Sequence, residues 1–210
     1  MDDYGPDAFS AEYGVSRETM DRLLAYDDVL VDWCARMNLV AKSTIESRWN
    51  RHFRDSAQLF DLLPTDTRTV LDLGSGAGFP GLVLAAMGAP SRLHVTLIES
   101  TGKKTAFLTA AAKAMDIDVS IHTERIEKAR LSSPPDVISA RALAPLPKLL
   151  GYAAAHGGAG TTFIFPKGQD VGSELTDASR CWNMNIDVRP SRTNPEAQIL
   201  ILRDVRRKSP

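Results

Sequence analysis

The sequence has little of what defines several large protein classes. Its 210 residues include two cysteines, Cys34 and Cys181, without metal-ligand spacing, which excludes a disulfide-rich scaffold and suits a reducing cytosol. No window approaches eighteen apolar residues, so no membrane-spanning helix is expected. The formal net charge of −1 gives no bulk attraction to nucleic acid and leaves RNA binding to local patches. We expect a soluble, cytoplasmic, monomeric protein without a bound metal.

One glycine-rich stretch at residues 70–81, VLDLGSGAGFPG, stands out in this sequence. Its first four residues are mostly apolar and predict a short buried strand. Gly74, Gly76 and Gly78 then allow a tight turn and a close approach to a ligand, and Pro80 suits the first turn of a following helix. A glycine turn at the carboxyl end of a strand is typical of a nucleotide-type site.

The glycine spacing leaves two cofactors open. Gly74, Gly76 and Gly78 are spaced as in S-adenosylmethionine sites, whereas Gly76, Gly78 and Gly81 also match the dinucleotide fingerprint. Asp72 favours the first cofactor, because its carboxylate would repel a pyrophosphate by about 3 kcal/mol at about 5 Å and a dielectric near about 20. The ammonium and sulfonium of S-adenosylmethionine are cationic and would be attracted instead. A purely structural glycine turn is the third interpretation.

Strand and helix patterns alternate from residue 69 onward, which is typical of an α/β sheet with parallel strands. Residues 1–15 predict a loosely ordered lead-in. Ser16 is a candidate N-cap for a first amphipathic helix, and Ser43 with Glu46 a candidate capping box for a second that stops at Pro64. We expect a helical N-terminal extension over residues 1–65 and a cofactor-binding domain over residues 66–210.

Seven strands in the predicted order match the class I methyltransferase variant of the doubly wound, mostly parallel sheet. The basic cluster at residues 203–208 predicts a solvated tail or an RNA contact. The expected strands are residues 70–73, 94–98, 119–122, 137–139, 162–165, 185–188 and 198–202, and the expected intervening helices are residues 81–87, 103–115, 146–155 and 171–181.

Two further strand ends offer groups for a nucleoside. Glu99 ends the second strand, where its carboxylate can accept hydrogen bonds from two ribose hydroxyls. The alternative is a charge that favours the N-terminus of the next helix. After the third strand, Ile126 can cover an adenine face and Glu127 can bind its polar edge, although an ordinary amphipathic turn also fits these residues.

The fourth and fifth strands are followed by cations. Arg141 lies at the edge that would face a transferred methyl group, and an ion-pair partner is its alternative role. Lys167 can reach a phosphate or base oxygen or remain a solvated loop lysine. His52 is expected to be a hydrogen-bonded packing residue of the second helix, with proton transfer as the alternative.

The absence of two motifs reduces the number of possible methyl-acceptor atoms. Amino-group methylation is typically accompanied by Asp/Asn-Pro-Pro-aromatic after the fourth strand, but Pro134 and Pro135 precede that strand and lack the aromatic. Carbon-5 methylation of a pyrimidine requires a nucleophilic cysteine beside a proline, and neither Cys34 nor Cys181 has one. A nitrogen with a free lone pair, such as guanine N7, needs neither base nor nucleophile, so positioning and electrostatics would supply the rate.

Six motifs carry a specific resemblance: residues 38–40 (NLV), 51–56 (RHFRDS), 71–81 (LDLGSGAGFPG), 99–104 (ESTGKK), 139–142 (SARA) and 166–168 (PKG). Together they resemble the bacterial 16S ribosomal RNA guanine-N7 methyltransferase family, also called the glucose-inhibited division protein B family. The likeness runs from about residue 20 to residue 203. It implies a cytoplasmic enzyme that methylates one guanine in the decoding region of the small-subunit RNA. The cofactor contacts it implies are Gly74, Phe79, Ile126, Glu127 and Arg141.

We therefore expect S-adenosylmethionine as the cofactor and 16S ribosomal RNA, in the small ribosomal subunit or an assembly intermediate, as the partner. Asp72 and the glycines would hold the methionine end and Glu99 the ribose, while Arg141 and Lys167 border the methyl-transfer pocket. A small-molecule methyltransferase on the same fold and a ribosome assembly factor with a vestigial cofactor site are the alternatives.

Overall fold

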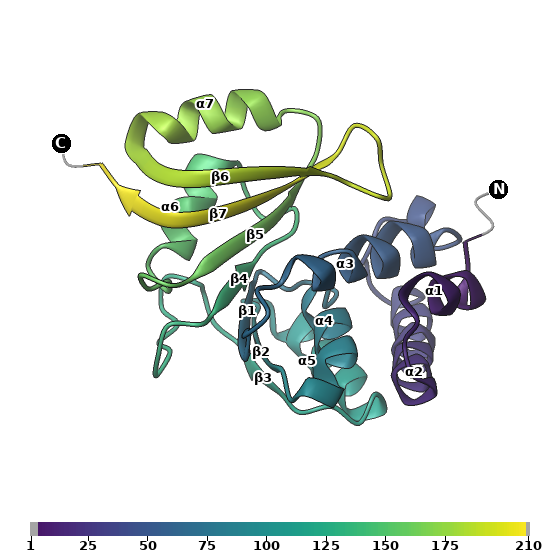
Figure 1. Cartoon of the computed structure of the whole chain (residues 1–210). Helices are drawn as coiled ribbons and strands as arrows, with labels where there is room; N and C mark the ends of the chain where they lie inside the picture. The colour runs from purple at the N-terminus through teal and green to yellow at the C-terminus, as the bar shows by residue number, and fades with distance from the viewer. Residues whose placement is uncertain (1–3, 209–210) are drawn as a thin grey trace.

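A seven-stranded sheet forms the centre of the computed structural model, which describes residues 4–208 (Figure 1). The strands are β1 (Thr69–Leu73), β2 (His94–Ile98), β3 (Val119–His122), β4 (Val137–Ser139), β5 (Thr162–Lys167), β6 (Trp182–Pro190) and β7 (Gln198–Arg207). Their order across the sheet is β3-β2-β1-β4-β5-β7-β6. β1 to β5 pair in parallel, and β7 pairs antiparallel with both β5 and β6. The predicted doubly wound, mostly parallel sheet is confirmed.

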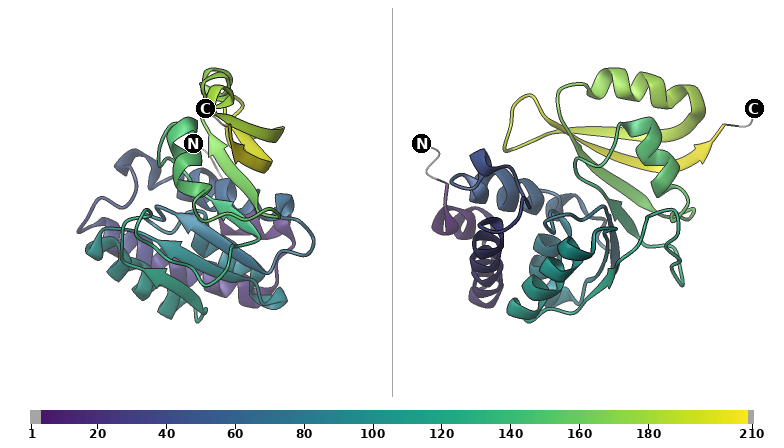
Figure 2. Two further views of the ribbon diagram at one scale, coloured as in Figure 1. Left: turned by 90° about the vertical axis from the view of Figure 1, so that its left-hand side faces the viewer. Right: turned by 180° about the vertical axis from the view of Figure 1, so that it is seen from behind.

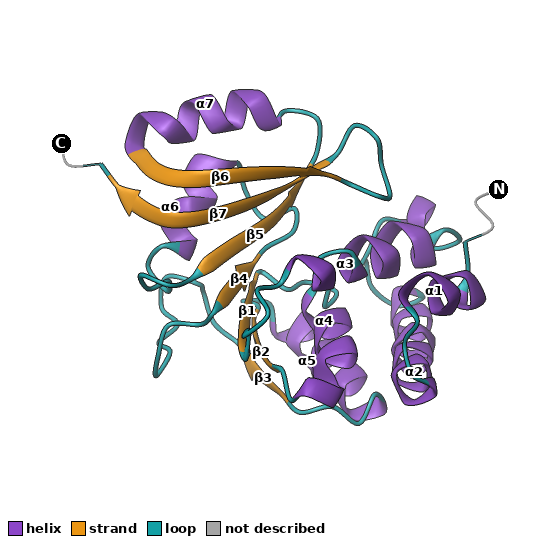
Figure 3. Ribbon diagram, in the orientation of Figure 1, coloured by secondary structure: helices purple, strands orange, loops and turns teal. Residues whose placement is uncertain are grey.

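Helices cover both faces of this sheet (Figures 2 and 3). They are α1 (Pro6–Tyr13), α2 (Arg17–Cys34), α3 (Asp55–Ala57), α4 (Gly81–Gly88), α5 (Gly102–Ala114), α6 (Leu146–Ala153) and α7 (Val171–Cys181). One apolar cluster joins the sheet to α2, α4 and α5, and a second joins it to α6 and α7. Val70 packs in the first cluster, and Leu71 and Leu73 pack in the second. This alternation places Asp72 on the α4 face of the sheet.

The strand predictions hold best for the parallel part of the sheet. β2, β3 and β4 have the predicted bounds, whereas β6 and β7 are longer than predicted. The basic cluster is part of the sheet and not a free tail, because residues 203–207 continue β7 against β6, with Arg203 opposite Asn185 and Arg207 opposite Trp182. The antiparallel partner strand supplies their backbone hydrogen bonds, while the arginine side chains stay exposed.

The N-terminal segment is more ordered than predicted. The expected lead-in includes helix α1, whose Phe9 is fully buried and meets the Trp49 ring edge-on at 5.5 Å; residues 1–3 lie outside the described part of the chain. The predicted N-cap is confirmed, because the Thr19 backbone N–H donates to Ser16 Oγ at 3.2 Å. Burial of Phe9, packing of Tyr13 and the ion pair between Glu12 and Arg54 at 2.9 Å together hold α1 on the core.

The predicted capping box at Ser43 and Glu46 is wrong. Residues Lys42–Thr44 form one 3₁₀ turn, η1, without a side-chain cap, and the next helix begins only at Trp49, as the π-helical turn η2 (Trp49–Arg54). Its start is set by α2, since the side chains of Arg48 and Trp49 both donate to Asp27. The short 3₁₀ turns η3 (Phe60–Leu62) and η4 (Ala89–Ser91) end the segment and α4 respectively.

Candidate functional site

The glycine turn after β1 has the predicted geometry. Gly74, Gly76 and Gly78 have φ values of 67°, 56° and 88°, a region that side chains other than glycine rarely adopt. The N–H groups of Gly74 and Ser75 donate to the carbonyl of Ile98 at 2.8 and 3.1 Å, which fastens the turn to the end of β2. A Cβ on Gly74 would lie 2.7 Å from Leu143 Cδ1. The positive φ values therefore favour glycine at all three positions, and Leu143 leaves no space for a side chain at Gly74.

Glu99 organises the neighbouring strand end. Its carboxylate is 6 % exposed and accepts hydrogen bonds from the backbone N–H of Gly76 at 3.1 Å and of Thr101 at 2.8 Å. Thr101 is the N-cap position of α5. Glu99 therefore also stabilises the start of this helix, which is the alternative role considered from the sequence. The same carboxylate also borders a cavity, which leaves its remaining acceptor sites free for a ligand.

A first cavity of about 330 Å³ opens at the carboxyl ends of β1 and β2. Three carboxylates line it against two cations, Lys104 and Arg125, which leaves one negative charge in excess. S-adenosylmethionine carries an ammonium, a sulfonium and one carboxylate, so its excess charge is opposite. The glycine wall, the buried carboxylate and the apolar Ile126 fit this cofactor. The lining residues are Gly74, Ile98, Glu99, Ser100, Thr101, Lys104, Glu124, Arg125, Ile126, Glu127, Ala142, Leu143 and Tyr152.

Asp72 lies beneath the glycine turn and lines no part of this cavity. It is fully buried, Ser139 Oγ donates to its Oδ1 at 2.9 Å, and its Oδ2 has no hydrogen-bond partner among the described residues. Burial raises the pKa of this carboxyl to about 6. A Cβ on Gly81 would lie 2.9 Å from Oδ2, which places the carboxylate against the start of α4. Direct contact between Asp72 and the cofactor stays a prediction.

Phe79, also predicted to touch the cofactor, faces the N-terminal segment. Its ring lies 5.1 Å from those of Tyr26 and His52, and the Arg141 guanidinium lies 5.1 Å above its centre. The Tyr26 hydroxyl donates to the carbonyl of Ala77, so α2 is bonded directly to the turn. In this structure Phe79 supports the turn and Arg141 rather than lining the cavity.

A second cavity, of about 450 Å³, adjoins the first at Ala142. Arg51, Arg141 and Lys167 supply three cations against two carboxylates, which leaves one positive charge in excess. Arg141 and Lys167 are thus brought together as the sequence predicts, but in the cavity that does not contain Ile126 and Glu127, so contact between Arg141 and the cofactor stays a prediction. The lining residues are Leu39, Val40, Arg51, His52, Asp55, Arg141, Ala142, Pro166, Lys167, Gly168, Glu174, Ser191, Thr193, Asn194, Ala197, Gln198 and Ile199.

Two of the three cations are held in ion pairs. Arg141 donates to Asp55 Oδ2 at 3.2 Å, and Lys167 Nζ lies 2.6 Å from Glu174 Oε2 and 3.1 Å from the carbonyl of Ala144. The ion-pair alternative considered for Arg141 therefore holds, although both side chains also face the cavity. Arg51 is exposed and has no carboxylate partner within residues 4–208. It carries the excess charge of the second cavity.

His52 lies between the two walls of the second cavity. Its ring stacks on Phe79, its Nε2 is 2.8 Å from Thr44 Oγ1, and its Nδ1 is 3.3 Å from an Arg141 nitrogen. Burial, together with the charges of Arg141 and Arg51, lowers the pKa of His52 to about 3. The ring is neutral at physiological pH, and its packing role agrees with the default expectation.

Sequence reasoning missed several lining residues. Of the first cavity, Lys104 belongs to the 99–104 motif, which was noted for Glu99, and Leu143 directly follows the 139–142 motif, which was noted for Arg141. Asp55 follows His52 within the RHFRDS motif. No local signal points to Thr193 or Glu174: Thr193 reaches the cavity on the loop between β6 and β7, and Glu174 reaches it from the first turn of α7, where it pairs with Lys167.

Within residues 4–208 we find neither a cluster of metal-ligating side chains nor a helix long and apolar enough to cross a bilayer.

Comparison with known proteins gives close relatives. Residues 19–195 match the family described as "rRNA small subunit methyltransferase G". The protein named ribosomal RNA small subunit methyltransferase G from Rhodospirillum centenum is 50 % identical over 197 residues, covering 94 % of this chain and 89 % of that protein. The protein of the same name from Rhodospirillum rubrum is 49 % identical over 202 residues, covering 96 % and 98 %.

Among solved structures, an O-methyltransferase from Bacillus cereus in complex with SAH superposes with a TM-score of 0.60 at 15 % identity, covering 93 % of this chain and 96 % of that chain. A 16S rRNA N2 G1207 methyltransferase from T. thermophilus, in complex with AdoMet and guanosine, gives 0.52 at 16 % identity, covering 74 % and 40 %. At such identities these structures show a shared class I methyltransferase fold.

Proposed function

Because this chain belongs to the rRNA small subunit methyltransferase G family, we propose that it transfers the methyl group of S-adenosylmethionine to N7 of one guanine in 16S ribosomal RNA. The observation that carries this proposal is the pair of adjoining cavities, which share Ala142 and have opposite excess charge. A cationic cofactor fits the first cavity and a polyanion fits the mouth of the second.

In the first cavity, the chain's own groups bind and orient the cofactor, which supplies an electrophilic methyl group when bound. Glu99 accepts hydrogen bonds from the ribose, Ile126 covers the adenine and Glu127 binds its polar edge. Gly74 and Gly76 let the backbone approach the methionine end. Asp72, buried beneath the turn, helps to hold the methionine end, because its negative charge attracts the ammonium and the sulfonium.

In the second cavity, Arg141 and Lys167 orient the guanine. N7 keeps a free lone pair at neutral pH, so the reaction needs no general base, and a neutral His52 agrees with this. Cations beside the base oxygen and the RNA backbone fix its position. The rate then comes from orientation and from fixed charges in the partly buried site.

The remaining assignments follow from the same proposal. The substrate is 16S ribosomal RNA within the small subunit or an assembly intermediate, the enzyme acts as a monomer in the cytoplasm, and residues 1–65 form an extension to the domain of residues 66–210. The bonds from α2 to the glycine turn support a stabilising role for this extension.

A methyl-transfer assay tests the function. Purified protein is incubated with labelled S-adenosylmethionine and small subunits from cells that lack the gene, and the label is mapped after borohydride reduction and aniline cleavage, which is selective for N7-methylguanine. We expect cleavage at one guanine of 16S RNA. Label on another atom would contradict the N7 assignment. Label on a small molecule alone would favour the small-molecule methyltransferase.

A calorimetric titration with S-adenosylhomocysteine addresses the remaining alternative. We expect measurable binding heat, with Glu99→Ala as the control that loses it. No binding heat from the native protein would indicate an assembly factor with a vestigial site.

A further inference from the structure

The Asp55 carboxylate joins three segments that lie far apart in the sequence. Its Oδ2 accepts a hydrogen bond from Arg141 at the end of β4, at 3.2 Å. Its Oδ1 accepts hydrogen bonds from Thr193 Oγ1 at 2.7 Å and from Gln58 Nε2 at 3.0 Å. One side chain of α3 therefore fixes both an arginine of the second cavity and the loop between β6 and β7.

That loop, residues 191–197, reaches from the far end of the sheet to the N-terminal helices (Figure 1). Gln58, 2 % exposed, accepts from the Arg192 backbone N–H at 2.8 Å and donates to Ser191 Oγ at 3.2 Å. Arg192 also pairs with Asp61 at 2.7 Å, where both side chains are nearly half exposed. The loop is thus attached by the hydrogen bond from Thr193 to Asp55, by those of Gln58, and by an ion pair at the surface.

Arg141 is held by an aromatic ring and by several hydrogen-bond partners. The Phe79 ring lies on one side of the guanidinium, and the same nitrogen that meets Asp55 lies 3.4 Å from the carbonyl of Arg51. A guanidinium is planar and donates its hydrogen bonds in fixed directions, so its interaction with a ligand depends on its orientation as well as on its charge. Without the carboxylate, this long and flexible side chain would be oriented only by the Phe79 ring, the carbonyl of Arg51 and the neutral His52, and would lose its ion pair.

We propose that Asp55 is a positioning residue that acts through Arg141. Thr193 and Gln58 fix the carboxylate, the carboxylate fixes the guanidinium, and the guanidinium faces the methyl acceptor. The inference rests on the proposed function, because it assigns Arg141 a role in methyl transfer. The competing explanation is that Asp55 merely attaches the loop, as Asp61 does on the outside.

The test compares Asp55→Asn, which keeps the size of the side chain and removes its charge, with Asp61→Asn, which removes the loop's surface ion pair without touching Arg141. Methyl transfer to small subunits from cells lacking the gene gives kcat and KM for each. We expect Asp55→Asn to lower kcat by about tenfold to a hundredfold with KM within about threefold, and Asp61→Asn to change kcat by less than about twofold.

A double-mutant cycle separates positioning from a structural role. If Asp55 acts through Arg141, adding Asp55→Asn to Arg141→Lys lowers kcat by less than about threefold. An undiminished loss in that background would overturn the proposal, as would equal losses in the Asp55 and Asp61 variants. Should Asp55→Asn not fold, Thr193→Val, which keeps the carboxylate and removes one of its donors, takes its place in the cycle. If the native protein methylates no RNA, the proposed function fails and this inference fails with it, whereas the outcomes above, in an active native enzyme, overturn this inference alone.

Discussion

The two cavities share one edge of the sheet and one residue, Ala142, yet they are built differently. The first is formed by consecutive strand ends and backbone N–H groups, with Glu99 bonded to the glycine turn. The second takes its walls from the N-terminal segment, from β4 and β5, and from the β6–β7 loop. The first is thus preorganised by local backbone geometry, whereas the second depends on side chains from opposite ends of the chain.

The two cavities also differ in the charge of their lining residues. The lining of the first cavity has one negative charge in excess and that of the second has one positive charge in excess, so the boundary at Ala142 separates an acidic cavity from a basic one. A methyltransferase for RNA needs this separation, because its cofactor and its substrate carry opposite charge and must meet at a single methyl group. Four single-residue changes test whether the two cavities act as separate sites.

The largest expected effect concerns the charge beneath the first cavity. In the unfolded chain, Asp72 loses its proton at about pH 4. Burial raises its pKa to about 6 in the folded protein, so the folded state keeps this proton up to a higher pH. The unfolded state thus binds fewer protons in this window, and Asp72 costs the fold about 3 kcal/mol as pH rises from about 4 to 6. Urea unfolding of native protein and Asp72→Asn at several pH values measures this loss. Parallel stability curves would contradict it.

Next comes the wall of the first cavity. Glu99→Ala removes two hydrogen bonds to backbone N–H groups and the acceptors for the ribose, so the affinity for S-adenosylhomocysteine falls by about a hundredfold. RNA affinity stays within about twofold, since no part of the second cavity changes. Calorimetry and filter binding measure the two ligands. Glu124→Ala is the matched control, because its carboxylate lines the same cavity without bonding the turn. Equal losses for both ligands would mean that the cavities are not separate sites.

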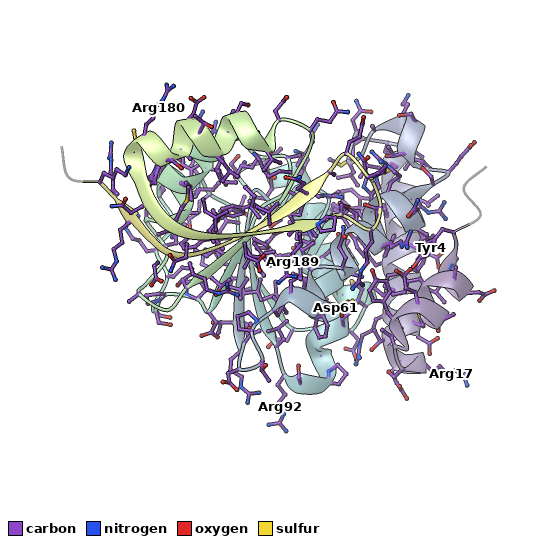
Figure 4. All side chains as sticks on the ribbon, turned by 45° about the horizontal axis from the view of Figure 1, so that its top comes forward. Tyr4, Arg17, Asp61, Arg92, Arg180 and Arg189 are labelled. Atoms are coloured by element: carbon purple, nitrogen blue, oxygen red, sulfur yellow. The ribbon has the colours of Figure 1, made fainter. Side chains whose placement is uncertain are left out.

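A smaller effect is expected at the mouth of the second cavity. Arg51 lacks a carboxylate partner within residues 4–208, and its replacement by alanine removes about one phosphate contact, which weakens RNA binding about fivefold and lowers the log–log salt slope by about one. Arg17→Ala is the control, since that side chain is 92 % exposed and points away from the protein (Figure 4). A steeper or unchanged salt slope in the Arg51 variant would remove it from the RNA interface.

The smallest effect is expected from His52. With a pKa of about 3 it stays neutral across the physiological range, so kcat changes by less than about twofold between about pH 6 and 9. The pH profile of methyl transfer measures this. A limb near pH 6.5 that disappears in His52→Gln would make His52 a proton-transfer group and contradict the unassisted attack by N7.

The same comparison explains what the sequence could predict. Gly74, Glu99, Ile126 and Glu127 were expected at the first cavity and line it, because parallel strands bring residues that follow each strand to one edge. Asp72 belongs to the same motif but does not line the cavity. Side chains alternate between the two faces of the sheet along β1, so the side chain of Asp72 points toward α4.

Only some of the residues that line the second cavity could be predicted from the sequence. Arg141 and Lys167 follow parallel strands and were expected beside the transferred methyl group. Asp55 and Thr193 meet only because the antiparallel β6–β7 loop folds back onto the N-terminal segment, a contact between residues 138 positions apart. Neither periodicity nor a motif encodes such a pairing, so it is seen only in the folded chain.

The central claim is tested most directly by mass mapping of 16S ribosomal RNA from cells that lack this gene, with and without the native gene restored. The account predicts that one N7-methylguanine disappears in the deletion strain, returns with the native gene, and does not return with the Glu99→Ala variant. An unchanged pattern of guanine modification in the deletion strain would contradict it.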